Sequence, residues 1–169
     1  TAQCRTFGRK PPGSYFRNEL EAVLVRRGVH KACALDRQRE RPKGAPLRVL
    51  YMPRTGAALQ SGSFRNFADD AALVSVLRRT LPAARLTTTP TPGGSVKLCD
   101  QVRLWASADV VLTPNGAHFV NAPFMHEGGV IVEGVPWSMR AYVGQLEITR
   151  YSGLDHRRLH SDRPPPTLA

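Results

Sequence analysis

Two short apolar runs, separated by a turn and a helical pattern, most constrain what this chain can fold into. Residues 110–112 form the first run, and residues 113–116 break it before small and apolar residues at helical spacing up to 125. The glycine pair at 128–129 then leads into the second run at 130–132, and we predict strands at 110–113 and 129–133 with a helix at 116–125 between them. Short continuous apolar runs are typical of parallel strands that are covered on both faces. The order therefore predicts a βαβ unit, in which a helix joins two parallel strands.

The same alternation of strand and helix continues upstream. Apolar and β-branched residues predict strands at 47–52 and 85–89, and apolar positions at helical spacing predict helices at 71–81 and 96–107. Alternation of this kind predicts an α/β fold, namely a Rossmann-like parallel sheet with flanking helices and right-handed crossovers. The helix at 96–107 is expected to bury one stripe of side chains: Leu98, Cys99, Val102, Trp105 and Ala106.

The two ends of the chain differ in composition from this central region. Residues 1–46 are basic, and we expect one helix within them, at 15–27. Residues 151–169 are polar and rich in proline, and we expect 155–169 to be disordered or extended. The predicted organisation is therefore a basic N-terminal segment, a Rossmann-like domain at 47–150 and a polar tail.

Composition limits the functional classes. The chain has 169 residues and a net charge of +11, and residues 1–54 hold 13 of its 24 basic residues but four of its 13 acidic ones. A basic face attracts polyanions such as nucleic acid, anionic lipid or nucleotide phosphates. The basic residues form no tight run and no aromatic residues alternate with them, so we favour a solvated surface and expect no nucleic-acid partner.

The sequence also bears on targeting and on cysteine chemistry. No apolar run approaches the roughly 20 residues of a membrane-spanning helix, and the N-terminus lacks the pattern of a signal peptide. Because the sequence begins with threonine and not with methionine, we expect a mature form or a fragment. The cysteines are Cys4, Cys33 and Cys99. Their spacing is compatible both with one disulfide and a free thiol and with three free thiols.

Polar and small residues lie where the predicted strands end. Ligands of open parallel sheets bind beyond the carboxyl ends of the strands. Arg54 follows the strand at 47–52, and Asn115 begins the turn NGAH after the strand at 110–113. A guanidinium can grip a phosphate with two hydrogen bonds, and small residues at a helix start expose backbone N–H groups to it. An ordinary βα turn with a solvent-facing arginine nearby is the competing interpretation.

The sequence around this turn resembles that of a known enzyme family. NGAHFVNAPFM at 115–125, followed by GGVIVEGVPW at 128–137, is similar to the signature near the C-terminal end of the glycosyltransferase family 61 catalytic domain. That signature is a strand, the sequence HGAGLTN, a Phe-Met pair and a strand that ends in glutamate. The matching residues are Gly116, Ala117, Asn121, Phe124, Met125 and Glu133.

Two positions of the turn differ from the family pattern. Asn115 stands in place of the usual histidine, and His118 stands in place of a small residue. Asparagine still donates and accepts hydrogen bonds, but it does not titrate. Upstream, the family has an arginine after a strand, followed by a second basic residue and an asparagine. Arg54, Arg65 and Asn66 stand in those places.

The resemblance implies a function as well as a fold. Members of this family resemble GT-B enzymes, in which two Rossmann-like halves enclose the active site, and they transfer a sugar from a nucleotide-sugar donor with inversion, usually without a bound metal. Residues 47–150 would then be the C-terminal, nucleotide-sugar-binding half, and a missing N-terminal half would supply acceptor contacts and the catalytic base. The resemblance further implies a UDP-sugar donor, a glycan or glycoprotein acceptor, no cofactor, and the Golgi or endoplasmic reticulum as location.

The implied donor site consists of residues from several strand ends: Arg54, Arg65, Asn115, Gly116, Ala117, His118, Asn121 and Glu133. Glu133 is expected to accept hydrogen bonds from ribose hydroxyls, as an acidic residue does in dinucleotide-binding folds. Two other hypotheses stay open, a non-catalytic α/β fragment and a polyanion- or nucleic-acid-binding module that uses the basic N-terminal segment. Arg54, Asn115 and His118 around one cleft would favour the enzyme, exposed apolar faces the fragment, and one continuous basic face the polyanion-binding module.

Overall fold

The computed structural model shows one sheet of five parallel strands in the order β2-β1-β3-β4-β5. The strands are β1 (Arg48–Tyr51), β2 (Arg85–Thr88), β3 (Val110–Pro114), β4 (Val130–Val135) and β5 (Asp155–His160). The structure describes residues 27–29, 31–33, 35, 43–54, 67–91, 96–141, 146, 148–149 and 152–161. The predicted α/β class with a Rossmann-like parallel sheet is confirmed.

Parallel pairing sets the carboxyl ends of all strands at one edge of the sheet. β1 lies between β2 and β3, and Leu50 pairs with Thr87 on one side and with Val111 on the other. The chain therefore runs outward from β1 to β2 and returns to the other side of β1 at β3, which makes the adjoining ends of β1 and β3 a topological switch point. β3 and β4 are also parallel, with Val111 opposite Ile131, as the βαβ pattern predicts.

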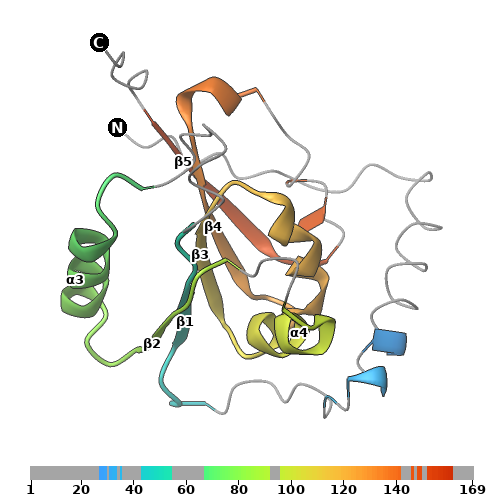
Figure 1. Cartoon of the computed structure of the whole chain (residues 1–169). Coiled ribbons are helices and arrows are strands. Elements are labelled where there is room, and N and C mark those ends of the chain that lie inside the picture. Colours follow the sequence, from blue (N-terminus) through green and yellow to red (C-terminus); the bar gives the residue numbers. More distant parts are fainter. Residues whose placement is uncertain are drawn as a thin grey trace.

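Helices lie on both faces of the sheet. α3 (Asp70–Thr80) lies on one face, and α4 (Leu98–Ala106) and η1 (Ala117–Phe124) lie on the other (Figure 1). A short 3₁₀ helix, η2 (Trp137–Met139), follows β4. Among the described residues, no helix has both the length and the apolar character needed to cross a membrane.

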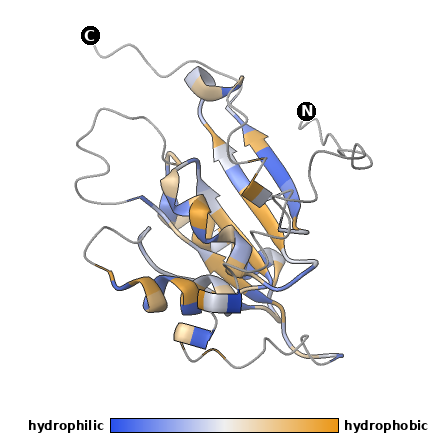
Figure 2. Cartoon of the chain, turned by 90° about the vertical axis from the view of Figure 1, so that its right-hand side faces the viewer, coloured by the Kyte–Doolittle hydropathy of each residue, from blue (hydrophilic) through white to orange (hydrophobic). Residues whose placement is uncertain are grey.

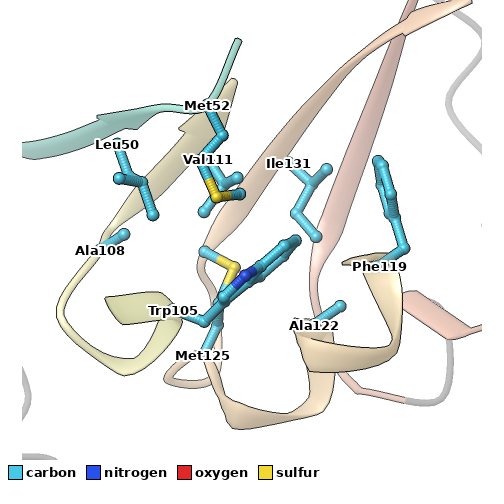
Figure 3. Packing of buried hydrophobic residues seen from close by; sticks show 9 residues of the cluster. All are labelled: Leu50, Met52, Trp105, Ala108, Val111, Phe119, Ala122, Met125 and Ile131. Carbon is cyan, nitrogen blue, oxygen red and sulfur yellow. The ribbon is translucent and has the colours of Figure 1, made fainter. Parts of the chain in front are cut away.

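The hydrophobic core lies between the sheet and the layer formed by α4 and η1 (Figure 3). Alternate strand residues such as Leu50, Val111 and Ile131 belong to this core, and Trp105 of α4 and Phe119 of η1 pack against them. The rings of Trp105 and Phe119 meet edge to face, with centroids 6.1 Å apart. The core thus fixes η1, and with it the turn that precedes η1, on the sheet.

The predicted buried stripe of α4 is confirmed for its central residues and wrong for its first. Val102, Trp105 and Ala106 are buried, whereas Leu98 is 56% exposed. The helix begins at Leu98, and side chains of a first turn lean toward the helix N-terminus, here beyond the edge of the core.

η1 is a 3₁₀ helix, so the α-helix predicted at 116–125 is wrong in type. Phe119, Ala122 and Met125 all enter the core, and their spacing of three residues matches one turn of a 3₁₀ helix. Pro123 has no N–H and disfavours an α-helical conformation for the residue before it. The spacing of three residues and Pro123 are both visible in the sequence. Together they favour a 3₁₀ helix over an α-helix.

Part of the predicted polar tail is a strand of the sheet. β5 pairs with β4 in parallel, with Arg158 opposite Glu133. The strand has the sequence DHRRLH and is hydrophilic (Figure 2), so it lacks the apolar alternation that identifies strands. His156 and Arg158 pair instead with the carboxylate of Glu133, at 3.1 and 3.0 Å. Of the expected disordered or extended tail, residues 155–160 are therefore an ordered, extended strand, and the sheet continues past residue 150.

A disulfide joins the N-terminal segment to α4. Cys33 and Cys99 are bonded, with Cα atoms 5.1 Å apart, which decides between the two cysteine states that the spacing left open. The guanidinium of Arg103, one turn along α4, also donates to the carbonyl of Cys33 at 3.0 Å. The helix predicted at 15–27 lies outside the described residues except for its last residue, and Cys4 lies outside them as well.

Removal of the disulfide should lower the free energy of unfolding. The bond links residues 66 positions apart, and a cross-link of this kind typically contributes about 2–4 kcal/mol, largely by restricting the unfolded chain. We expect Cys99→Ser to unfold in less urea by that free energy, and the matched control Cys4→Ser, which leaves the Cys33–Cys99 bond intact, to unfold like the wild type. An unchanged urea midpoint after reduction of the wild type would contradict this role.

Candidate functional site

The site is built where β1 and β3 end side by side. The Met52 amide donates to the Leu112 carbonyl at 2.9 Å, and the Thr113 hydroxyl donates to the Met52 carbonyl at 3.1 Å. These bonds hold the two strand ends together. Arg54, two residues past Met52, then donates from Nη1 to the Asn115 carbonyl at 2.9 Å. The structure thus brings two predicted site residues into contact at the switch point of the sheet.

Gly116 provides the space in which three predicted site residues meet. A Cβ atom at Gly116 would lie 2.7 Å from His118 Nδ1 and 3.1 Å from Arg54 Nη1. The glycine has a φ of 177°, an extended conformation open to any residue, so the position requires the absence of a side chain and no unusual backbone. The imidazole and the guanidinium can both approach the backbone of the turn because Gly116 is there.

His118 is held as a neutral imidazole beside the turn. Its Nε2 lies 2.7 Å from the hydroxyl of Thr113. The pKa of His118 is lowered to about 4, chiefly by burial; the nearby Arg54 guanidinium acts in the same direction, and Glu133 acts in the opposite direction. When the Thr113 hydroxyl donates to Met52, Nε2–H donates to Thr113, and Nδ1 is left as an acceptor on the side of Gly116 and Arg54.

Backbone N–H groups are available at the start of η1. The first hydrogen bond of this helix runs from the Phe119 amide to the Gly116 carbonyl at 3.3 Å. The amides of Ala117 and His118 precede that bond, and amides at a helix start point outward and favour negative charge. A guanidinium, an imidazole and the first amides of a helix therefore converge on the turn at 115–118.

Asn115 faces inward from the same turn. Its side chain is fully buried, and Nδ2 donates to Glu133 Oε1 at 2.5 Å. Its amide donates to the Gly134 carbonyl at 2.8 Å, which continues the pairing of β3 and β4. The side-chain Nδ2, the amide and the carbonyl of Asn115 are thus engaged, the last by Arg54, whereas the buried Oδ1 has no hydrogen-bond partner within the described part of the chain.

Glu133, the residue expected to accept hydrogen bonds from a ribose, has a buried carboxylate with partners in this chain. Its side chain is 1% exposed and accepts from Asn115, from His156 Nε2 at 3.1 Å and from Arg158 Nε at 3.0 Å. Burial acts to raise the pKa of Glu133, but hydrogen bonds from His156 and Asn115 outweigh it, so the pKa lies below its usual range and the group is ionised. Alternation along β4 puts this carboxylate on the face of buried Ile131, where three partners enclose it and turn it away from solvent.

The remaining predicted residues differ in their positions. Asn121 is buried, and its Nδ2 donates to Gln101 Oε1 and to the His118 carbonyl, both at 3.2 Å, so it joins η1 to α4. Arg65 lies outside the described residues. No group of three or more His, Cys, Asp or Glu side chains suited to a metal ion occurs in the part of the chain that the structure describes.

Sequence reasoning missed three residues of this network, Thr113, His156 and Arg158. Thr113 is the last side chain on the core face of β3, so strict alternation from Val111 would have identified it. His156 and Arg158 alternate in DHRRLH, which indicates one basic face on a strand. The basic face of this strand can be interpreted once Glu133 of the neighbouring β4 is known to be a buried carboxylate that needs hydrogen-bond donors.

The fold defines a class of α/β protein with a parallel sheet, and a guanidinium, an imidazole and the amides of a helix start lie at the switch point of that sheet. The sequence model of one family, described as Glycosyltransferase 61, matches residues 11–132. The chain belongs to this family, and the resemblance inferred from its turn sequence is confirmed. The match includes Arg54 and the turn at 115–118 and ends one residue before Glu133. A comparison with curated proteins gives no significant match.

The buried neutral His118 predicts a pH dependence of stability. Its pKa falls from 6.5 to about 4 on folding, so between these values the unfolded chain binds more protons than the folded one. Its contribution to stability should be complete above pH 6.5 and decline as the pH falls to 4, by up to about 3 kcal/mol. Urea unfolding of wild type and His118→Asn across this range should show the smaller decline in the variant. An imidazole NMR titration of His118 with its midpoint near 6.5 would contradict the assignment.

Proposed function

We propose that this chain is the donor-binding half of an inverting glycosyltransferase. It would bind a nucleotide sugar, with a UDP-sugar as the foremost candidate, and the sugar would pass to a glycan or protein acceptor. Membership of the glycosyltransferase 61 family supports the reaction class. The observation that most strongly supports the site is the convergence of Arg54, the backbone of 115–118 and His118 around Gly116.

A nucleoside diphosphate matches the chemistry of this turn. Its diphosphate is anionic, and Arg54 offers a fixed positive charge whose planar fork suits phosphate oxygens. The amides of Ala117 and His118 add backbone donors at a helix start. Gly116 has no side chain, so the guanidinium can lie close to the backbone of the turn that carries these amides. The proposed binding mode uses only groups of this chain.

The same groups would assist the transfer. In an inverting reaction an acceptor hydroxyl attacks the anomeric carbon from the side opposite the leaving group and loses its proton to a base. The bond from the anomeric carbon to the β-phosphate oxygen breaks, and negative charge grows on the departing diphosphate. Arg54 and the turn amides are placed to stabilise that charge, which is differential binding of the transition state. We propose that the base and the acceptor contacts come from another part of the enzyme.

Two further observations support parts of this proposal. Within the described residues of α3 no side chain is fully buried, and Val76 and Leu81 are 43% and 37% exposed. Such apolar exposure is compatible with a half that packs against another domain. The Cys33–Cys99 disulfide is typical of proteins from an oxidising compartment. On this basis we propose a location in the secretory pathway, in the Golgi or endoplasmic reticulum.

The other two hypotheses find less support. Arg54 contacts Asn115, and the guanidinium and the His118 imidazole both lie beside Gly116, which supports the enzyme. In a non-catalytic fragment, nothing would require the Arg54 guanidinium and the His118 imidazole to lie beside the amides of a helix start. The basic residues before 43 that would form a polyanion-binding face lie mostly outside the described residues.

Loss of the Arg54 guanidinium should weaken binding of nucleoside diphosphates. We expect Arg54→Ala to weaken UDP binding by about 1.5–3 kcal/mol, the range for hydrogen bonds to charged groups. Arg54→Lys should recover only part of this, because a point charge cannot replace the fork. Calorimetric titration of UDP and other nucleoside diphosphates, with a chelator present, measures the effect. Arg79→Ala, which removes an exposed arginine of α3, is the matched control and should bind like the wild type.

Two results would contradict the assignment of the site. The first is a folded wild type that binds none of the nucleoside diphosphates. The second is an Arg54→Ala variant that stays folded and binds as tightly as the wild type.

A further inference from the structure

Glu133 is the centre of a polar network that crosses three strands. The strand register places Thr113 of β3, Glu133 of β4 and Arg158 of β5 side by side, so their side chains leave the same face of the sheet. Glu133 Oε2 accepts from His156 and Arg158, and Oε1 accepts from Asn115 Nδ2. Oε2 therefore binds side chains of β5, and Oε1 binds the turn that follows β3.

The β5 side of this network is rigid. His156 Nδ1 lies 2.7 Å from the Thr149 hydroxyl, and its ring stacks on Phe119 with centroids 5.7 Å apart. Both ring nitrogens are thereby engaged, and Nε2 must present its hydrogen to the Glu133 carboxylate, which only accepts. With His156 and Arg158 on one side, Glu133 has little freedom to move.

The turn side of the network leads to Arg54. Because an ionised carboxylate only accepts, Asn115 has to present Nδ2 to Glu133, and this fixes which way its amide points. The backbone of Asn115 is also fixed by its bond to Gly134, and its carbonyl accepts from Arg54 Nη1. Glu133 is thus connected to the Arg54 guanidinium through Asn115, without touching it.

We propose that Glu133 is a positioning residue for the phosphate-binding guanidinium: clamped by His156 and Arg158, it orients Asn115 so that the Asn115 carbonyl holds Arg54 beside Gly116. The inference rests on the proposed function for its ligand, but the positioning itself is a property of the free protein. Burying an ionised carboxylate costs desolvation free energy that an apolar residue would avoid. Orientation of a binding group is a reason to keep a carboxylate here.

Glu133→Gln is the informative substitution. Glutamine has the size of glutamate, but its amide both donates and accepts. Its oxygen should turn toward the donors of His156 and Arg158, and its NH₂ group then faces Asn115, whose own amide has to reverse. The fold survives this exchange more readily than Glu133→Ala, which would leave the N–H donors of His156 and Arg158 without their acceptor.

Asp109→Asn is the matched control. Asp109 is the other buried carboxylate of the described sheet and accepts from Arg48 and from His126. It lies at the start of β3, at the opposite edge from Arg54. The same chemical change there tests the general effect of neutralising a buried carboxylate on the protein.

The first measurement is the side-chain NMR signal of Arg54 in the ligand-free protein, assigned through Arg54→Ala. We expect Glu133→Gln to shift or broaden the Arg54 Nε–Hε resonance and Asp109→Asn to leave it in place. An unchanged Arg54 signal in folded Glu133→Gln would overturn the positioning role, whatever the protein binds.

The second measurement is a double-mutant cycle on UDP affinity. We expect Glu133→Gln to weaken UDP binding about tenfold, as loss of an outer-shell partner does at other sites. In the Arg54→Ala background the same substitution should cost less than about twofold, because no guanidinium is left to position. Asp109→Asn should also cost less than about twofold while lowering thermal stability. Additive effects of the two substitutions would overturn the positioning role, and a wild type that does not bind UDP would overturn the proposed function and the ligand assigned here.

Discussion

The parallel pairing of β1 with β3 is the interaction on which the candidate site depends. The Met52 amide and carbonyl are bonded to Leu112 and Thr113, so the two strands end at the same level. Only then can Arg54, which follows one strand, reach the Asn115 carbonyl, which follows the other. A slip of one residue in this register would turn Met52 and Thr113 to the opposite face and separate the groups that now meet at the turn.

Two buried carboxylates stabilise opposite edges of the sheet in similar ways. Asp109, at the start of β3, accepts from Arg48 and His126, and its pKa is lowered because hydrogen bonds from Arg48 outweigh the effect of burial. Glu133, near the end of β4, accepts from an arginine and a histidine of β5. The difference is the additional bond from Glu133 to Asn115. Within the described part of the chain, Asp109 therefore accepts from residues that stabilise the sheet, whereas Glu133 also contacts the turn of the proposed donor site.

Much of the fold could be predicted from the sequence, because strands covered on both faces need continuous apolar runs. Val110 to Leu112 and Val130 to Val132 are such runs, and both are strands. The strand at Asp155–His160 could not be predicted in this way, because its inward side chains pair with a buried carboxylate and are polar. The 3₁₀ geometry of η1 depends on Pro123 and on a spacing of three, which a search for general helical periodicity does not separate from an α-helix.

The site could be predicted in part. Because parallel strands end at one edge, the contact of Arg54 with Asn115 and the proximity of His118 follow from their positions after β1 and β3. The buried position of Glu133 was not predicted, although alternation along β4 directs the carboxylate inward. Partners such as His156 come from a strand that the sequence did not reveal. Contacts between residues of different strands can be predicted only when the order of the strands in the sheet is known.

The central claim is that Arg54 and the turn at 115–118 form the phosphate-binding part of a donor site. A crystal structure of the chain with bound UDP tests it most directly. Our account predicts the diphosphate at the carboxyl ends of β1 and β3, with its oxygens on the Arg54 guanidinium and on the amides of Ala117 and His118. UDP bound at another edge of the sheet, without contact to Arg54, would contradict the claim.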